Sequence, residues 1–420
     1  MRRDAPPRSS VRAPLGSSRS ARMERNILEL YRPDISRLLA ESGAPAFRRA
    51  QILEHLLQRP DLAFAEATAL PLEMRASLDE LGWSTLTVQD STSSADGATK
   101  LLLKTQDLVA VETVIMRYRD RVTACISSQV GCPVGCAFCA TGALGFTRNL
   151  SPAEIVDQVR AASSVVAAEG RRLTNLVYMG MGEPLLNLRS VLDSIRVLTD
   201  PGGINMAHRA ISVSTVGIPS GIRRLGQREP QVNLALSLHA ADDRTRALLI
   251  PGKFRHPLSD ILDAAWEHFD LTKRKLLIEY VLIAGVNDSV EDAHRLAKLL
   301  RGHVVAVNLL AWNPVQASLR RDFNVGTTCE EPERHPGGKC GGTHPEPTEE
   351  GAGRTTWPHV GQRTAAGFRQ PASRTISAFR STLVSSRIET VVRQSKGATI
   401  QAACGQLAAQ RRGNPAARAK

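Results

Sequence analysis

The stretch Cys132-Pro133-Val134-Gly135-Cys136-Ala137-Phe138-Cys139 places three cysteines on one short segment, with the spacing C-x3-C-x2-C. Three thiolates this close suit three corners of a [4Fe–4S] cluster, which leaves the fourth iron open to bind a substrate. A structural zinc site needs four ligands, typically arranged as two close pairs. The spacing therefore favours a cluster, and the alternative is a zinc loop completed by a distant ligand such as Cys125.

Cysteine usage and hydropathy restrict the class of protein. Of the seven cysteines in 420 residues, four lie between positions 125 and 139. The sequence starts without the apolar segment of a signal peptide, so we expect a cytoplasmic protein whose clustered thiols are metal ligands or catalysts. No apolar run approaches the roughly 18 residues of a membrane span, which excludes an integral membrane protein.

The charge balance indicates a polyanionic partner. Lysine and arginine number 54 against 41 acidic residues, which gives a net charge of +13. Nucleic acid is the commonest partner of such a chain, and the alternative is that basic tails serve only solubility. A length of 420 residues is enough for two or three domains.

Composition and periodicity divide the chain into segments. Residues 1–22 are rich in Arg, Ser and Pro and are predicted to be a disordered basic arm, unless they are a transit peptide or translation begins at Met23. A helical pattern over 23–83 predicts a small accessory module. In 84–120, the polar residues 84–98 are expected to be a linker or loop, and the runs 101–104 and 109–116 predict a hairpin.

Strand and helix patterns alternate between 121 and 313, which predicts an α/β core. The clearest helix start is Ser151-Pro152-Ala153-Glu154, a capping box with proline at the first helical position. Apolar strands that alternate with helices form a buried parallel sheet, and six units are too few for an eight-fold barrel. We therefore expect a partial (βα)6 TIM-like barrel, with strands at 122–127, 173–179, 210–216, 232–239, 275–283 and 304–312.

The last hundred residues interrupt and then resume this pattern. Residues 314–373 are rich in Gly and Pro and are predicted to be a disordered insertion. The C-terminal part of the core is expected at 374–409, with a helix at 376–383 and a strand at 388–394, before a basic tail at 410–420. The insertion contains Cys329, His335, Cys340 and His344, but their spacing fits no standard zinc finger, so no metal site is predicted there.

Around the cysteine motif the chain resembles the radical-SAM enzymes, and among them the RNA adenine-C2 methyltransferases, the RlmN family with its relative Cfr. The resemblance extends from about residue 24 to 409, except for the insertion. A lone C-x3-C-x2-C would indicate only the superfamily, whereas the ordered set of segments is specific. These segments are VETV (111–114), CISSQVGC (125–132), CAFCATG (136–142), GFTRNL (145–150), MGMGEPLLN (179–187), VSTVG (213–217), SLHA (237–240), IEYVL (278–282), GVND (285–288), WNP (312–314) and AACGQL (402–407).

The resemblance implies a cofactor site at the carboxyl ends of the strands. Cys132, Cys136 and Cys139 would ligate a [4Fe–4S] cluster. Gly182 and Glu183 would hold the amino end of S-adenosylmethionine, in keeping with glycines that let backbone approach a ligand and a carboxylate that binds an ammonium. The pocket would be completed by Ser214, Ser237, Leu238, His239 and Asn313.

The resemblance also implies a radical mechanism. Such a mechanism is needed because carbon 2 of adenine is not nucleophilic enough to attack a methylsulfonium. One S-adenosylmethionine would methylate Cys404, and a second would yield a radical that activates this methyl group for addition to the base. Cys125 would then attack the Cys404 sulfur to form a disulfide and resolve the protein–RNA adduct. Glu112 would accept the ring proton.

By the same resemblance, the substrates would be an adenosine in the peptidyl transferase centre of 23S rRNA and the adenosine 3′ to the anticodon of tRNAs. The helical module and basic surface would bind RNA phosphates, the electron donor would be a flavodoxin or ferredoxin, and the enzyme would be a monomer. Two alternatives stay open: a Cfr-type methyltransferase acting on carbon 8, and a zinc-stabilised RNA-binding protein without catalysis.

Overall fold

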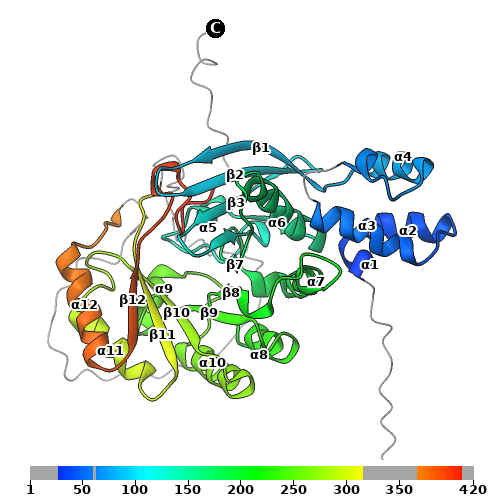
Figure 1. The fold of residues 1–420 in the computed structure, drawn as a ribbon. Helices are drawn as coiled ribbons and strands as arrows, with labels where there is room; N and C mark the ends of the chain where they lie inside the picture. Colours follow the sequence, from blue (N-terminus) through cyan, green and yellow to red (C-terminus); the bar gives the residue numbers. More distant parts are fainter. Residues whose placement is uncertain (1–26, 60–62, 316–366, 409–420) are drawn as a thin grey trace, which may run out of the picture.

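The fold is built on one ten-stranded sheet, seen in a computed structural model that describes residues 27–59, 63–315 and 367–408. The strand order is β1-β2-β3-β4-β7-β8-β9-β10-β11-β12, and the two end strands, β1 and β12, do not pair with each other. The sheet therefore curves as an open, partial barrel (Figure 1). The two chain ends and the Cys/His residues of the predicted insertion lie outside the described residues.

Seven neighbouring strands of this sheet are parallel. All six strands expected in the core are present, and the strand expected at 388–394 adds a seventh beside β11. Most of their residues are buried, as expected for parallel strands that are covered on both faces. They are β4 (Val122–Cys125), β7 (Asn175–Tyr178), β8 (Ile211–Thr215), β9 (Asn233–Ser237), β10 (Leu276–Leu282), β11 (Val305–Ala311) and β12 (Glu389–Arg393).

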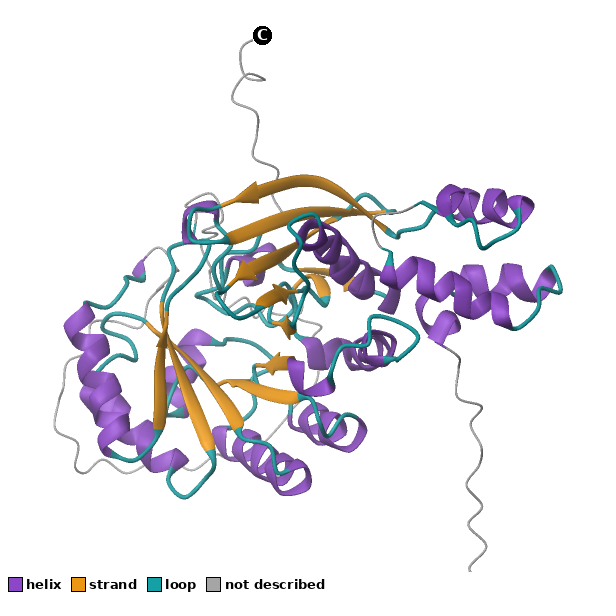
Figure 2. Cartoon of the chain, viewed as in Figure 1, coloured by secondary structure: helices purple, strands orange, loops and turns teal. Residues whose placement is uncertain are grey.

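Helices connect these strands and lie on the outside of the curved sheet (Figure 2). The predicted capping box begins α6: the Ser151 hydroxyl accepts the Glu154 N–H, and the Glu154 carboxylate accepts the Ser151 N–H at 2.8 Å. The helices of this layer are α6 (Pro152–Ala167), α7 (Leu188–Thr199), α8 (Pro219–Arg228), α10 (Leu258–Thr272), α11 (Val290–Leu300) and α12 (Ser373–Ser385). The short helix α9 (Asp243–Leu249) instead lies beside the cysteine motif, where the Ala137 N–H donates to the Leu249 carbonyl at 2.9 Å.

Three antiparallel strands extend the sheet beyond β4. β2 (Ala98–Thr105) and β3 (Ala110–Arg117) form the predicted hairpin. The expectation of a linker over 84–98 was wrong, because β1 (Leu86–Ser93) pairs with β2 along its length. β1 is an edge strand exposed at most positions, so it lacks the apolar alternation by which a strand is usually predicted.

The segment after β12 returns to this hairpin. The Gly397 N–H donates to the Asp96 carboxylate at 2.7 Å, and the Lys100 ammonium donates to the Gln401 carbonyl at 3.2 Å. The chain thereby passes from the last parallel strand to the β1–β2 turn, through the short 3-10 helix Ala398–Ile400. This crossing places the C-terminal motif opposite the cysteine motif.

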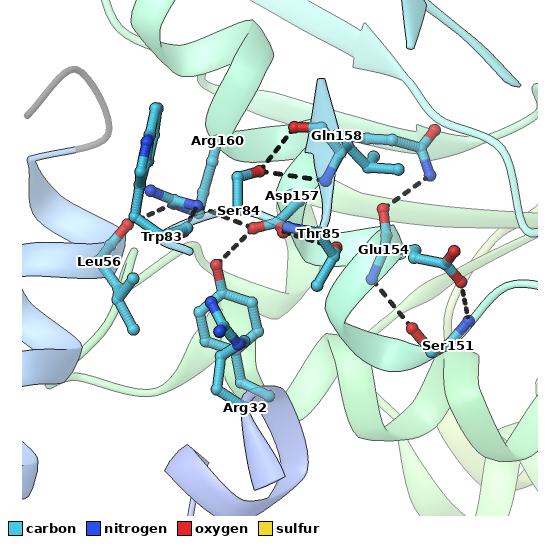
Figure 3. A network of polar contacts seen from close by, with 12 residues as sticks. Arg32, Leu56, Trp83, Ser84, Thr85, Ser151, Glu154, Asp157, Gln158 and Arg160 are labelled. Atoms are coloured by element: carbon cyan, nitrogen blue, oxygen red, sulfur yellow. Dashed lines mark hydrogen bonds and ion pairs between the residues drawn. The ribbon is translucent and has the colours of Figure 1, made fainter. Parts of the chain in front are cut away.

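The N-terminal helices pack beside α6 and α7. They are α1 (Ile27–Tyr31), α2 (Pro33–Glu41), α3 (Phe47–Gln58) and α4 (Leu72–Leu81), with a 3-10 turn at Phe64–Glu66. A buried ion pair within α6, Asp157 with Arg160 at 2.9 Å, fixes them. Arg160 donates to the carbonyl oxygens of Leu56 and Trp83, and Asp157 accepts from Thr85 (Figure 3).

Candidate active site

A pocket lies where the parallel strands end. Its wall includes side chains at or just beyond the carboxyl ends of β4, β7, β8, β9, β11 and β12, the edge at which α/β folds bind ligands. Eleven of the thirteen predicted site residues line it: Cys125, Cys132, Cys136, Cys139, Gly182, Glu183, Ser214, Ser237, His239, Asn313 and Cys404.

The three motif cysteines lie on a loop whose base is closed by a two-stranded ladder. β5 (Gln129–Gly131) pairs with β6 (Phe146–Asn149), and the short helix α5 (Ala140–Leu144) lies between them. The two backbones of this ladder approach closely at Gly131, where a Cβ atom would lie 1.9 Å from the Gly145 carbonyl oxygen. The ladder therefore requires glycine at 131, and it presents all three thiols to one pocket.

The chemistry of these thiols fits an iron–sulfur cluster. Burial raises the pKa of Cys132 to about 12 and raises the pKa of Cys136 well above its ordinary value, so binding of a metal would favour the thiolate form of these two residues. Among the described residues, no three His, Cys, Asp or Glu side chains gather as a single metal ion requires. A cluster does not require this, since its three thiolates each bind a different iron.

A buried carboxylate, Glu183, lines the same pocket as the three motif cysteines and acts electrostatically on Cys132 and Cys136. One oxygen of Glu183 accepts the Val216 N–H at 2.8 Å, and the other accepts the Leu185 N–H at 3.0 Å, which caps the 3-10 helix Pro184–Asn187. Burial raises the Glu183 pKa to about 7, and the two N–H groups oppose that rise. A cationic ligand group would relieve the cost of a buried carboxylate.

The backbone before Glu183 needs glycine. Gly182 has a φ of +100°, and a Cβ atom there would lie 2.6 Å from the Gln129 side chain. The Gln129 amide oxygen accepts the Glu183 N–H at 2.9 Å. Gly182 thus allows β5 to approach the β7 loop and fixes the direction of the carboxylate.

Ser214, Ser237 and His239 form the next part of the wall. The two serine hydroxyls lie 3.0 Å apart, since β8 and β9 are neighbours. Nδ1 of His239 accepts the Val281 N–H at 3.1 Å, which leaves the ring proton on Nε2. Burial lowers the His239 pKa to about 3, so the ring is a neutral donor at physiological pH.

The C-terminal loop that carries Cys404 is bound to the cysteine loop and to β11. The Ala140 N–H donates to the Gly405 carbonyl at 2.7 Å, and the Asn313 side-chain amide donates to the Cys404 carbonyl at 3.3 Å. The Cys404 thiol is accessible from the pocket, and its neighbours include Cys125. The pocket walls around the exposed Cys404 thiol desolvate it and raise its pKa to about 11, and burial raises the pKa of Cys125 to about 12, so both are neutral thiols at pH 7.

Comparison with known proteins agrees with this geometry. The model of the radical SAM superfamily matches residues 126–297. A probable dual-specificity RNA methyltransferase RlmN of Heliobacterium modesticaldum is 39% identical over 90% of this chain and 88% of its own length. The dual-specificity RNA methyltransferase RlmN of Syntrophobacter fumaroxidans is 38% identical over 90% of this chain and 96% of its own. The chain belongs to the RlmN family.

A solved structure extends the match to the fold. The crystal structure of a radical SAM methyltransferase from Sphaerobacter thermophilus is 37% identical, covers 91% of this chain and 98% of its own, and superposes with a TM-score of 0.76. The predicted fold class and family are confirmed. The chain is a methyltransferase that acts on RNA, so the alternative of a non-catalytic zinc protein is rejected. The superfamily implies an iron–sulfur cluster and S-adenosylmethionine.

Two residues that the RlmN resemblance assigns to the site do not line the pocket. The Leu238 side chain is fully buried in the core. Glu112, on β3, lies beneath the C-terminal loop: one oxygen pairs with the Lys100 ammonium at 2.8 Å, and the other accepts the Ala408 N–H at 2.7 Å. In this structure Glu112 therefore holds the Cys404 loop from below.

Other residues position the site without having been predicted. Asn287 is fully buried and donates to the carbonyl oxygens of His239 and Val281 at 2.7 and 2.6 Å. Arg246 is fully buried and donates to the carbonyls of Val216 and Leu238, which joins the ends of β8 and β9. The GVND segment contains Asn287, so the motif pointed to it, whereas no motif pointed to Arg246.

Among the described residues, no helix is both long and apolar enough to cross a membrane.

Proposed function

We propose that this protein methylates carbon 2 of an adenosine in the peptidyl transferase centre of 23S rRNA, and of the adenosine 3′ to the anticodon in tRNAs. One observation carries the proposal. Two cysteines outside the cluster motif, Cys125 and Cys404, line the same pocket as the three motif cysteines and Glu183. A simple methyltransferase has no need of them, whereas a methyl carrier and a resolving thiol are what an unreactive ring carbon requires.

The cofactors would be held by two neighbouring sets of residues in one pocket. Cys132, Cys136 and Cys139 would bind the cluster, and the Glu183 carboxylate would bind the ammonium of S-adenosylmethionine. When bound, two molecules of S-adenosylmethionine per turnover would supply the methyl group and the radical that activates it. The neutral His239 would donate a hydrogen bond from Nε2 without adding charge.

The two thiols would then act in sequence. The Cys404 sulfur would carry the methyl group, and loss of one of its hydrogen atoms to the radical would free its carbon to bond to carbon 2 of the adenine. Glu112 would accept the proton from carbon 2, once Ala408 has moved off its carboxylate, while the adduct returns one electron to the bound cluster. Cys125 would then attack the Cys404 sulfur, so that a Cys125–Cys404 disulfide forms and the carbon–sulfur bond breaks with its electron pair left on the former methyl carbon, which takes up a proton and stays on the base as a methyl group. An external dithiol reduces the disulfide before the next turnover.

The order of these steps can be tested with two single substitutions. Cys125→Ala keeps the methyl carrier, so it should accumulate RNA bound covalently through Cys404, visible as a nuclease-sensitive shift on a denaturing gel. Cys404→Ala should give neither product nor shift, because no methyl group can be carried. Normal turnover by Cys125→Ala, or an equal shift with Cys404→Ala, would contradict the roles.

The substrates can be tested separately, in cells with and without the gene. Mass spectrometry of 23S rRNA and tRNA should show 2-methyladenosine only when the gene is present. Methylation at carbon 8 instead would overturn the proposed position and favour the Cfr-type alternative. The proposal also includes a monomer in the cytoplasm and a flavodoxin or ferredoxin as electron donor.

A further inference from the structure

The active-site pocket has a second wall to which neither the cluster nor the cofactor residues belong. It is formed by alternate residues of β3 and its end, Val114, Met116 and Tyr118, together with Arg393 and Lys396 at the end of β12. Residues two apart on a strand point to one face of the sheet. Val114 is the direct cross-strand partner of Cys125, so this wall begins at the resolving thiol.

Two cations gather around one aromatic ring on this wall. The Lys396 ammonium lies 5.0 Å from the centroid of the Tyr118 ring, and the Arg121 guanidinium lies 4.2 Å from it. Arg393 adjoins the Tyr118 hydroxyl and pairs with Glu279 at 3.5 Å. A guanidinium has five N–H donors, so this loose pair leaves donors for a further acceptor.

The net charge of the N-terminal helical module bears on which cations of the protein bind RNA phosphates. The predicted helical module, residues 23–83, carries seven arginines and no lysine against ten acidic residues. Its net charge is negative, although the whole chain carries +13. The net charge therefore favours cations outside this module as partners of the RNA phosphates. On the second wall, Arg393 lies close enough to Cys125 and Cys404 to act on both thiols.

We propose that the second wall is the subsite for the target nucleotide, in which Arg393 and Lys396 bind its backbone phosphate while Tyr118 and Met116 contact the flipped base. The inference rests on the proposed function, since it takes the ligand to be one nucleotide of an RNA. Proteins that read unpaired bases place them against aromatic side chains, and arginine binds phosphate with two parallel hydrogen bonds. The position beside Cys125 puts the base next to the thiol that must later release it.

The test compares Arg393→Gln, Lys396→Gln and a matched control, Lys275→Gln. Lys275 directly precedes β10 and pairs with Glu389, at the end of β12 opposite to Arg393. Lys275→Gln therefore removes one positive charge from beside the same strand, away from the pocket. Each variant, loaded with iron, is assayed for methylation of an RNA hairpin and for RNA-independent methylation of Cys404. Loss of a charged hydrogen bond to phosphate should raise KM for RNA by about tenfold or more.

We expect this rise for Arg393→Gln and Lys396→Gln, a partial recovery in Arg393→Lys and no change in Lys275→Gln. In Lys396→Gln, Cys404 should be methylated at the wild-type rate, whereas Arg393 also acts on the Cys404 thiol and is judged by KM alone. A KM for RNA within twofold of wild type in both variants would overturn the subsite. Equal loss of Cys404 methylation in Lys396→Gln would overturn it too, because the wall would then serve the cofactor. If Arg393→Gln fails to fold, Lys396→Gln decides. A different result would refute the proposed function itself, namely a wild-type product other than 2-methyladenosine.

Discussion

The buried carboxylate of Asp157 tests how firmly the N-terminal helices are fixed to the barrel. It is 1% exposed and accepts four hydrogen bonds: from the Tyr31 hydroxyl at 2.5 Å, from the N–H and hydroxyl of Thr85, and from Arg160. Asp157→Ala removes all four. It also leaves the guanidinium of Arg160, itself 2% exposed, without a counter-ion in the interior.

The expected cost follows from this burial. Removal of one partner of a buried ion pair lowers the free energy of unfolding by about 3–5 kcal/mol, because the remaining charge is unpaired. Tyr31→Phe removes only one neutral donor and should cost about 0.5–1.5 kcal/mol. The double variant Asp157→Ala/Arg160→Met should cost less than the sum of the single changes, since no unpaired charge remains.

Urea denaturation followed by tryptophan fluorescence measures these differences, and Trp83 reports on this region because Arg160 lies 4.9 Å from its ring centroid. The matched control is Asp120→Ala. Asp120 pairs with Arg121 at 3.3 Å but is 74% exposed, so its removal should change stability by no more than about 0.5 kcal/mol. A free energy of unfolding for Asp157→Ala within about 1 kcal/mol of wild type would refute the reasoning.

Three further predictions concern the site and its flanks. Cys136→Ala should lose iron and all cleavage of S-adenosylmethionine, and a full iron content would contradict the cluster assignment. Asn287→Ala should weaken S-adenosylmethionine binding, measured by calorimetry, because the His239 carbonyl loses its donor; unchanged affinity would deny it a positioning role. Replacement of residues 320–366 by a short Gly/Ser linker should preserve methylation, since it keeps Phe368, whose ring lies 6.0 Å from that of Trp312, so that both ends of the segment stay close together; loss of activity in a folded, iron-loaded protein would count against this.

Local pattern was sufficient to predict the parallel core. The core strands β4 and β7 to β11 are mainly apolar, because helices and the barrel interior cover both faces, and the Ser151 capping box marks the start of α6. β1 was not predicted, because its side chains are mostly exposed and show no apolar alternation, and because its pairing with β2 is seen only in the folded structure. β5 and β6 were not predicted for a different reason, since segments of three and four residues are too short for any period to show.

The active site likewise has one part that local motifs predict and another part that depends on contacts between distant segments. Its cofactor side is made by loops that directly follow strands, such as Gly182 and Glu183 after β7, so short motifs were enough to predict it. The Cys404 side depends on contacts between residues nearly 300 positions apart, among them Glu112 with Ala408 and Lys100 with Gln401. A motif can indicate that Cys404 is a carrier. Only the crossing of the chain from β12 to the β1–β2 turn explains why that carrier faces Cys125 and the cluster loop in one pocket.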